Sequence, residues 1–114
     1  VPPELVRRVA AAVRQGAAAV VPVLPLADTV KEVADHVVVA TVDRVRLRAA
    51  QTPQGFARRV LARAHATVRQ DATDDAALVE ALGVQVVAVH GAPEAFKITH
   101  TFDLAVAAAL LAQR

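Results

Sequence analysis

The chain has 114 residues, of which 55% are apolar and 21% charged, and it contains no cysteine. Its 13 basic and 11 acidic side chains leave a net charge of +2, too close to balance to indicate a nucleic-acid or membrane surface. The apolar content excludes a disordered chain, and the lack of cysteine excludes disulfides, thiolate metal sites and thiol redox chemistry, as expected of a cytoplasmic protein. We therefore expect one domain, or part of one.

The first third of the chain predicts a helix, a buried strand and a hairpin. Two prolines precede apolar residues at helical spacing, and Gly16 follows them as a stop signal. The continuous apolar run at residues 17–24 is typical of a strand that is covered on both faces. Residues 29–41 then carry two short strand signals around Asp35 and His36, which predict a hairpin arm outside the main sheet.

The next segment predicts a strand with one cationic face. Residues 43–51 alternate strictly, so that Arg44, Arg46 and Arg48 share one face of the expected strand. A row of like charges is stable either in water or opposite an anion such as a phosphate. Spacing alone leaves both interpretations open.

The rest of the chain alternates between helix and strand signals. Residues 55–67 show helical spacing, and a second helix is expected to start at Thr73, whose hydroxyl can cap it, and to end at Gly83. The remaining elements are expected to be a strand at 84–89, a turn at 91–93, a short strand at 96–99 and a helix that Thr101 caps. This order predicts an α/β fold with a mainly parallel sheet, helices on its faces and ligands at the carboxyl ends of its strands.

Three further side chains can serve either a ligand or the fold. Thr52 stands where a strand turns into a helix, so it either meets an anion or belongs to a helix cap. Thr73, followed by two aspartates, either lines a ligand site or only begins a helix. Lys97 lies between apolar neighbours, where an amine either meets an anion or extends along the surface into water.

No complete nucleotide or metal motif is present. The sequence has no Walker loop, no Gly-x-Gly-x-x-Gly and no Gly-x-Ser-x-Gly, and its four histidines lack metal-ligand spacing, so no metal site is expected. The apolar run at residues 17–26 is interrupted by two prolines and is too short to span a bilayer. There is no methionine, even at position 1, and we therefore expect a piece of a longer protein.

Five sequence blocks resemble one known family in order and spacing. They are Pro25–Lys31, Thr41–Arg44, Gln51–Phe56, Thr73–Ala76, and Phe96–Thr99 with Asp103-Leu104. These blocks are similar to those of the 2-C-methyl-D-erythritol 4-phosphate cytidylyltransferases. The resemblance runs over residues 1–114 and corresponds to the second half of that family's length.

The resemblance implies a fold and a reaction. The chain would be the C-terminal half of a single Rossmann-like nucleotidyltransferase domain, a mainly parallel sheet with flanking helices and a protruding β-arm. The implied enzyme transfers CMP from CTP to 2-C-methyl-D-erythritol 4-phosphate, releases pyrophosphate, and serves the non-mevalonate isoprenoid pathway in the cytoplasm. In the family the upstream half binds CTP through a glycine-rich loop, and Mg²⁺ is held mainly through CTP and that half. Alone, this chain would be inactive.

The resemblance also implies roles for four residues. Arg44 and Lys97 would position the methylerythritol phosphate, and Thr52 and Thr73 would add substrate contacts. The family is a homodimer, so the arm at about residues 28–43 would clasp the partner. In that dimer, Arg44 and Thr52 would reach the neighbouring subunit's substrate.

Two alternatives remain at this point. One is a related cytidylyltransferase for another polyol phosphate, such as ribitol phosphate. The other is a non-catalytic α/β domain whose arm serves only dimerisation. Neither alternative involves a nucleic acid or a membrane.

Overall fold

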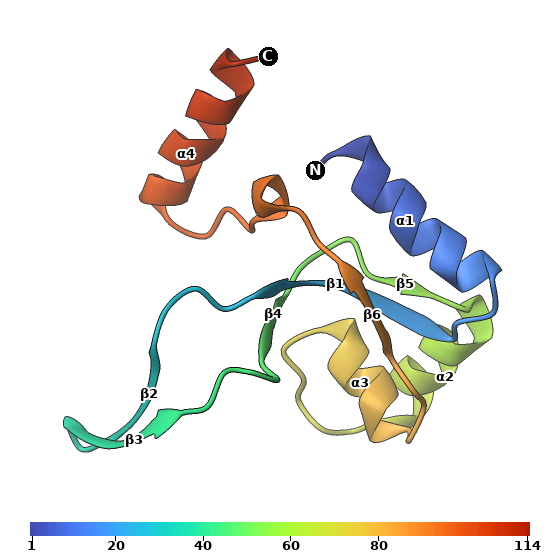
Figure 1. Cartoon of the computed structure of the whole chain (residues 1–114). Coiled ribbons are helices and arrows are strands. Elements are labelled where there is room, and N and C mark those ends of the chain that lie inside the picture. The colour runs from blue at the N-terminus through green and yellow to red at the C-terminus, as the bar shows by residue number, and fades with distance from the viewer.

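The computed structural model describes residues 1–114, in which a four-stranded sheet is flanked by helices and a two-stranded arm stands apart (Figure 1). The helices are α1 (Pro3–Arg14), α2 (Arg58–Thr67), α3 (Asp75–Ala81), the 3₁₀ helix η1 (Pro93–Ala95) and α4 (Thr101–Ala112). The strands are β1 (Ala19–Pro25), β2 (Val30–Ala34), β3 (Val37–Val42), β4 (Arg48–Ala50), β5 (Gly55–Phe56) and β6 (Val87–His90). None of the helices has the length and apolar character needed to cross a membrane.

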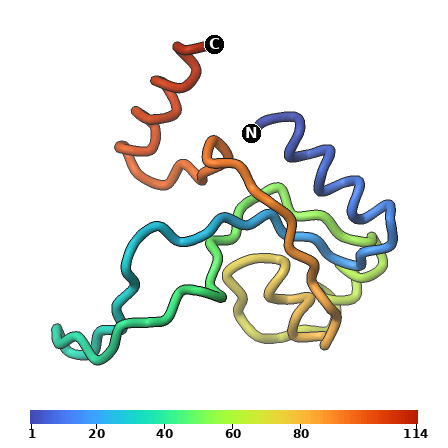
Figure 2. The backbone as a smooth tube through the Cα atoms, in the orientation of Figure 1, coloured from blue at the N-terminus to red at the C-terminus, as the bar shows by residue number.

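Strand β1 pairs with every other strand of the main sheet. It runs parallel to β6, with Val20 opposite Val87, and antiparallel to β4 and β5, with Val23 opposite Ala50 and Ala19 opposite Phe56. The α/β class is confirmed, and the pairing within this chain is mixed rather than mainly parallel. The reason is the arm, which reverses the chain and returns it along β1 in the opposite direction (Figure 2).

The predicted burial of β1 on both faces is confirmed by two apolar clusters. Neighbouring strand residues point to opposite faces of a sheet. Val20 accordingly packs with Leu5 and Val9 of α1, while Ala19 packs against α2 and α3 on the other face. The predicted first helix is confirmed as α1, and its apolar stripe supplies two of the four buried residues of the first cluster.

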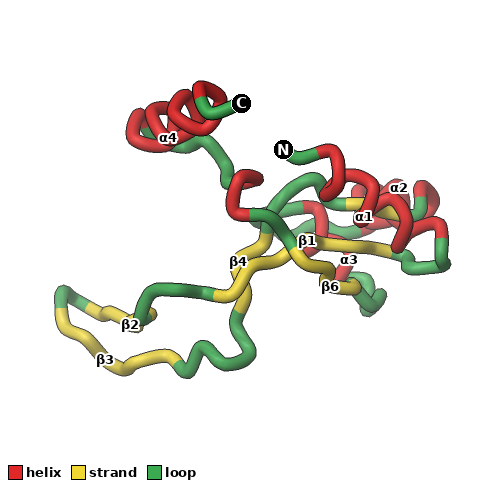
Figure 3. Tube along the Cα trace, turned by 45° about the horizontal axis from the view of Figure 1, so that its top comes forward, coloured by secondary structure: helices red, strands yellow, loops and turns green.

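The predicted hairpin is confirmed as a β2–β3 sheet of its own. Asp35 and His36 form its turn with φ values of 49° and 64°, the left-handed conformation of a tight hairpin turn. The arm extends away from the main sheet (Figure 3). Most of its side chains are exposed, and the large apolar ones among them are Val33, Val37, Val38 and Val39.

Helix α4 presents apolar side chains to solvent. None of its residues is buried, and Phe102 and Leu111 are 75% and 63% exposed. The ribbon shows α4 apart from the sheet and its flanking helices (Figure 1). The predicted cap at Thr101 is wrong by one residue, because Asp103 accepts hydrogen bonds from the backbone N–H groups of Thr99 and His100, and the N-cap is His100.

The strand predicted at residues 43–51 is confirmed only at Arg48–Ala50. Before it the chain makes a turn, in which the Asp43 carboxylate accepts the Val45 N–H at 3.1 Å and the Arg44 carbonyl accepts the Leu47 N–H at 3.1 Å. An aspartate that binds the backbone two residues ahead is a turn signal, and here it overrides the alternation. The three arginines therefore do not form a row on one strand face.

Four other elements differ from prediction in their bounds, their cap or their presence. Gly55 and Phe56 pair with β1 instead of starting a helix, so α2 begins at Arg58. The third helix is capped by Asp74 rather than Thr73, and Gly83, with φ of 78°, follows its end as predicted. The strand predicted at 84–89 is β6 at Val87–His90, and the strand predicted at 96–99 is irregular backbone.

Candidate functional site

A cleft of about 620 Å³ brings together three of the four residues that the sequence singles out. Thr52 comes from the loop between β4 and β5, Thr73 lies just before α3, and Lys97 follows η1. All three side chains belong to exposed residues. The full lining is Leu24, Ala49, Ala50, Gln51, Thr52, Gln54, Thr73, Asp74, Pro93, Ala95, Phe96 and Lys97.

The electrostatics of this cleft favour an anion beside Lys97. Lys97 is the one cation among the lining residues, and it makes no ion pair with the rest of the chain. The one carboxylate, that of Asp74, is already engaged by a backbone N–H and a side-chain amide. An ammonium group and two hydroxyls that line one cleft supply hydrogen-bond donors of the kind that a phosphate accepts.

Thr52 lies in the loop at residues 52–54, where the chain leaves its pairing with β1 between β4 and β5. The Gln51 N–H still donates to the Pro22 carbonyl at 2.8 Å, and pairing resumes at Gly55, so residues 52–54 bulge out of the ladder. Gly55 is needed where the strand passes under α1, because a Cβ there would lie 2.7 Å from Cγ1 of Val9. The loop is thus fixed at both ends by the sheet.

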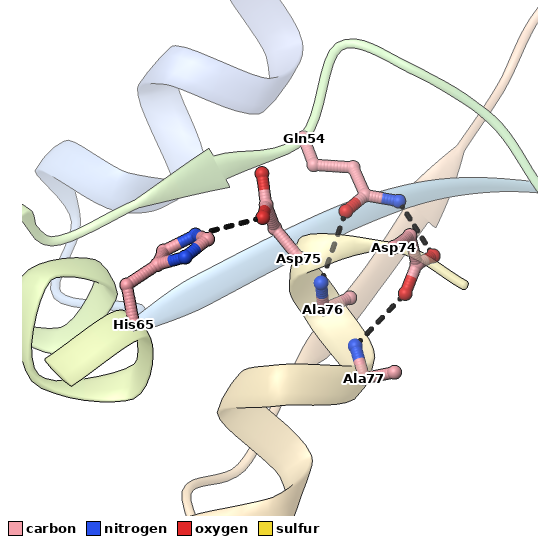
Figure 4. A network of polar contacts seen from close by, with 6 residues as sticks. All are labelled: Gln54, His65, Asp74, Asp75, Ala76 and Ala77. Atoms are coloured by element: carbon pink, nitrogen blue, oxygen red, sulfur yellow. Dashed lines mark hydrogen bonds and ion pairs between the residues drawn. The ribbon is translucent and has the colours of Figure 1, made fainter. Parts of the chain in front are cut away.

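A polar network joins this loop to the start of α3 (Figure 4). The Gln54 side chain donates from Nε2 to Oδ2 of Asp74 at 2.9 Å and accepts the Ala76 N–H at 3.2 Å. The other oxygen of Asp74 accepts the Ala77 N–H at 2.8 Å, which caps the helix. Thr73 immediately precedes this capped turn, so the network sets its place relative to Thr52.

Gln51 joins the other end of the loop to the turn after β6. Its Nε2 donates to the Ala92 carbonyl at 2.9 Å, and its Oε1 accepts the Ala92 N–H at 3.0 Å. The neighbouring Gly91 leaves room for this side chain, because a Cβ there would lie 2.1 Å from Oε1 of Gln51. Sequence reasoning missed both glutamines, since their partners lie 41 and 20 residues away and no local pattern marks them.

Arg44 lies outside the cleft, at the base of the arm. Its Nη1 donates to the carbonyls of Leu26 at 2.8 Å and Asp28 at 3.3 Å, and the residue is exposed. Arg48 likewise binds backbone carbonyls, those of Val45 and Leu47. The structure therefore brings together Thr52, Thr73 and Lys97 and places Arg44 elsewhere within the single chain.

A second cleft of about 610 Å³ is lined by the same loop and by α2 and α3. Thr52 and Thr73 line this cleft as well. His65 of α2 and Asp75 of α3 meet in it, with Nε2 2.9 Å from Oδ1 (Figure 4). This pair links the two helices, in agreement with reading the histidines as surface or structural residues.

No set of side chains in the chain forms a metal site. The structure contains no group of three or more His, Cys, Asp or Glu residues that could hold a metal ion. A hard cation such as Mg²⁺ takes oxygen ligands from carboxylates, waters and substrate phosphates. The residues present do not fit such a site by themselves.

Residues 1–113 match the family model described as 2-C-methyl-D-erythritol 4-phosphate cytidylyltransferase. Proteins of that name from Streptomyces coelicolor and Frankia casuarinae are 56% and 62% identical to the chain, over 100% and 98% of it. The matched parts are 45% and 42% of those relatives, so the chain spans about half the length of the curated relatives it matches.

Solved structures show the same likeness. The crystal structure of 2-C-methyl-D-erythritol 4-phosphate cytidylyltransferase from Thermus thermophilus is 44% identical, with a TM-score of 0.90 over 98% of this chain and 56% of that one. A crystal structure of a 4-diphosphocytidyl-2C-methyl-D-erythritol synthase is 35% identical, with a TM-score of 0.86 over 97% of this chain and 51% of that one.

Proposed function

The chain belongs to the 2-C-methyl-D-erythritol 4-phosphate cytidylyltransferase family, and we propose that it is the acceptor-binding half of such an enzyme. In this proposal the whole protein transfers CMP from CTP to 2-C-methyl-D-erythritol 4-phosphate. The observation that carries the proposal is the cleft shared by Thr52, Thr73 and Lys97, three residues that lie far apart in sequence. Lys97 and the two hydroxyls would hold the phosphate of the acceptor.

The proposed reaction is an in-line displacement at phosphorus. An oxygen of the acceptor phosphate forms a bond to the α-phosphorus of CTP, and the bond from that phosphorus to the bridging oxygen breaks. Pyrophosphate leaves with the electron pair of the broken bond. Such a reaction depends on positioning and charge stabilisation and needs no side-chain nucleophile. Lys97 would neutralise charge on the acceptor phosphate and fix its orientation beside the nucleotide.

CTP and Mg²⁺ are assigned to the whole protein rather than to this chain. The chain has no residue set that fits a metal, so no step is derived through the ion. We propose that the nucleotide and the residues outside this chain hold it, and that the chain alone is inactive. A cytoplasmic location is part of the proposal, because cells keep CTP there.

We also propose that the arm forms a homodimer contact. Two observations support this: the arm carries exposed valines, and it forms a sheet that no other element of the chain covers. Arg44 stands at the base of that arm and uses only Nη1 for its backbone contacts. Its remaining N–H groups are available to a phosphate, and we propose that Arg44 serves the neighbouring subunit's acceptor site.

Pyrophosphate release by the full-length protein tests the proposed function. The protein is given CTP and Mg²⁺ with either 2-C-methyl-D-erythritol 4-phosphate or ribitol phosphate. Release with the first acceptor supports the proposal, and release with ribitol phosphate alone supports the other polyol specificity. Release with neither acceptor would leave a non-catalytic dimerisation domain as the better explanation. The 114-residue chain alone, in the same assay, should release none.

A further inference from the structure

We infer that Gln51 and Gln54 are positioning residues of the acceptor cleft. Each clamps one end of the loop that carries Thr52 to another segment that lines the cleft. Together they would set the distances between the two threonine hydroxyls and the Lys97 ammonium group. The inference rests on the proposed function, because positioning has meaning only for a site that binds an acceptor.

Gln51 couples the loop to the segment that carries Lys97. Its side-chain amide makes a paired hydrogen bond with both backbone groups of Ala92, at 2.9 and 3.0 Å. Ala92 begins the turn into η1, where Ala95 is only 4% exposed and packs in the cluster formed with α1. That anchored turn leads to Lys97, so the paired hydrogen bond ties Thr52 to a fixed starting point of the lysine segment.

The backbone around Gln51 is built to admit its side chain. Gly91 donates its N–H to the Val23 carbonyl at 2.8 Å and offers no Cβ, and the space a Cβ would occupy holds the Gln51 amide. The amide therefore packs closely against the turn after β6, to which its two hydrogen bonds tie it. A side chain held so closely has little freedom to move when a ligand binds.

Gln54 couples the other end of the loop to the segment that carries Thr73. It bonds Asp74, the N-cap residue of α3, and the N–H of Ala76 in the first turn of that helix. That turn is anchored by Ala76, which is 5% exposed, and by the fully buried Val79. Thr73 precedes Asp74 directly, so Gln54 fixes the loop against the residue before the cap.

Most of the hydrogen-bonding capacity of the two glutamines is used within the chain. The Gln54 amide nitrogen donates to Asp74 and to the Gln51 carbonyl, and the Gln51 amide pairs with both backbone groups of Ala92, which leaves one N–H of Gln51 without a partner in the chain. Both side chains are partly buried, whereas Thr52, Thr73 and Lys97 are exposed. The glutamines therefore act through the groups they hold, and their loss should alter the placement of those groups rather than remove a ligand contact.

Steady-state kinetics of the full-length protein separates positioning from a purely stabilising role. Gln51→Met and Gln54→Met keep side-chain length and remove the amide, and the exposed Gln85→Met serves as the matched control. We expect the KM for 2-C-methyl-D-erythritol 4-phosphate to rise about tenfold in each loop variant, the scale of one lost hydrogen-bonded constraint. The KM for CTP should stay within about twofold of the wild-type value, because CTP is proposed to bind in the other half of the protein.

The outcomes distinguish this inference from the function on which it rests. A wild-type protein that releases no pyrophosphate overturns both. An active wild type whose loop variants leave the acceptor KM unchanged, or change both KM values equally, overturns the inference alone. Should a methionine variant not fold, Gln51→Asn replaces it, because it keeps an uncharged amide and its shorter side chain cannot reach both backbone groups of Ala92. It should raise the acceptor KM selectively, and an unchanged value contradicts the inference.

Discussion

Replacing Gly91 by alanine should destabilise the protein mainly through a steric conflict with the Gln51 side chain. The new Cβ would lie 2.1 Å from Oε1 of Gln51 and 3.1 Å from the Val23 carbonyl oxygen. Gln51 is the side chain that must move, and moving it breaks both of its hydrogen bonds to Ala92. At about 1 kcal/mol for each hydrogen bond, Gly91→Ala should cost about 2 kcal/mol of unfolding free energy.

The double variant Gly91→Ala/Gln51→Ala tests whether the two substitutions act through the same hydrogen bonds. Gln51→Ala alone should also cost about 2 kcal/mol, because it loses the same two hydrogen bonds. In Gly91→Ala/Gln51→Ala the contact with Oε1 is absent and only the 3.1 Å approach to the Val23 carbonyl oxygen remains, so the total cost should stay near 2 kcal/mol instead of about 4 kcal/mol. Urea denaturation of the four proteins measures these values. Costs that add would refute the view that Gly91 exists to admit the Gln51 side chain.

Three further experiments test the site and its supports. In the full-length protein, Lys97→Ala should lower kcat/KM for the acceptor by an amount equivalent to about 2 to 4 kcal/mol of transition-state stabilisation. An unchanged kcat/KM would contradict the proposed role of Lys97. Asp74→Ala removes the cap of α3 and should lower the unfolding free energy, measured by urea denaturation, by about 1 to 2 kcal/mol. Thr73→Ala breaks no hydrogen bond within the chain and should lower it by less than about 0.5 kcal/mol. Equal losses would contradict the assignment of the cap to Asp74. Gly55→Ala should lower the unfolding free energy by about 1 to 3 kcal/mol, because its Cβ would lie 2.7 Å from Cγ1 of Val9. The same substitution made in the Val9→Ala protein should lower it by less.

The elements predicted correctly from sequence are those specified by nearby residues. The apolar stripe of α1, the continuous apolar run of β1 and the turn at Asp35 and His36 are all signals carried by residues a few positions apart. Gly83 likewise follows α3 as its stop signal predicts. Such local signals do not require knowledge of the rest of the fold.

The elements predicted wrongly depend on competition between signals or on distant partners. Residues 43–51 alternate like a strand, but the Asp43 carboxylate binds the backbone and makes a turn. Phe56 fits a helical stripe, yet it pairs with Ala19 in the sheet. Phe96 to Thr99 have the composition of a strand and find no edge in this chain to pair with.

The residues of the candidate site could be predicted from the sequence, but their arrangement in space could not. Thr52, Thr73 and Lys97 were identified from the motifs that contain them, and their shared cleft appears only in the fold. Their roles, and that of Arg44, stay predictions. The role of Gln51 could not be predicted, because its side-chain amide bonds the backbone of a residue 41 positions away and no sequence periodicity marks such a contact.

The central position of β1 divides the molecule into two units of stability. Strands β4, β5 and β6 all make their ladders with β1, so opening that strand releases the whole main sheet at once. The arm shares no ladder with it, because β2 and β3 pair only with each other. We therefore expect amide hydrogens of β1 to exchange with solvent only when the domain unfolds, and those of the arm to exchange through openings that leave the cleft of Thr52, Thr73 and Lys97 intact.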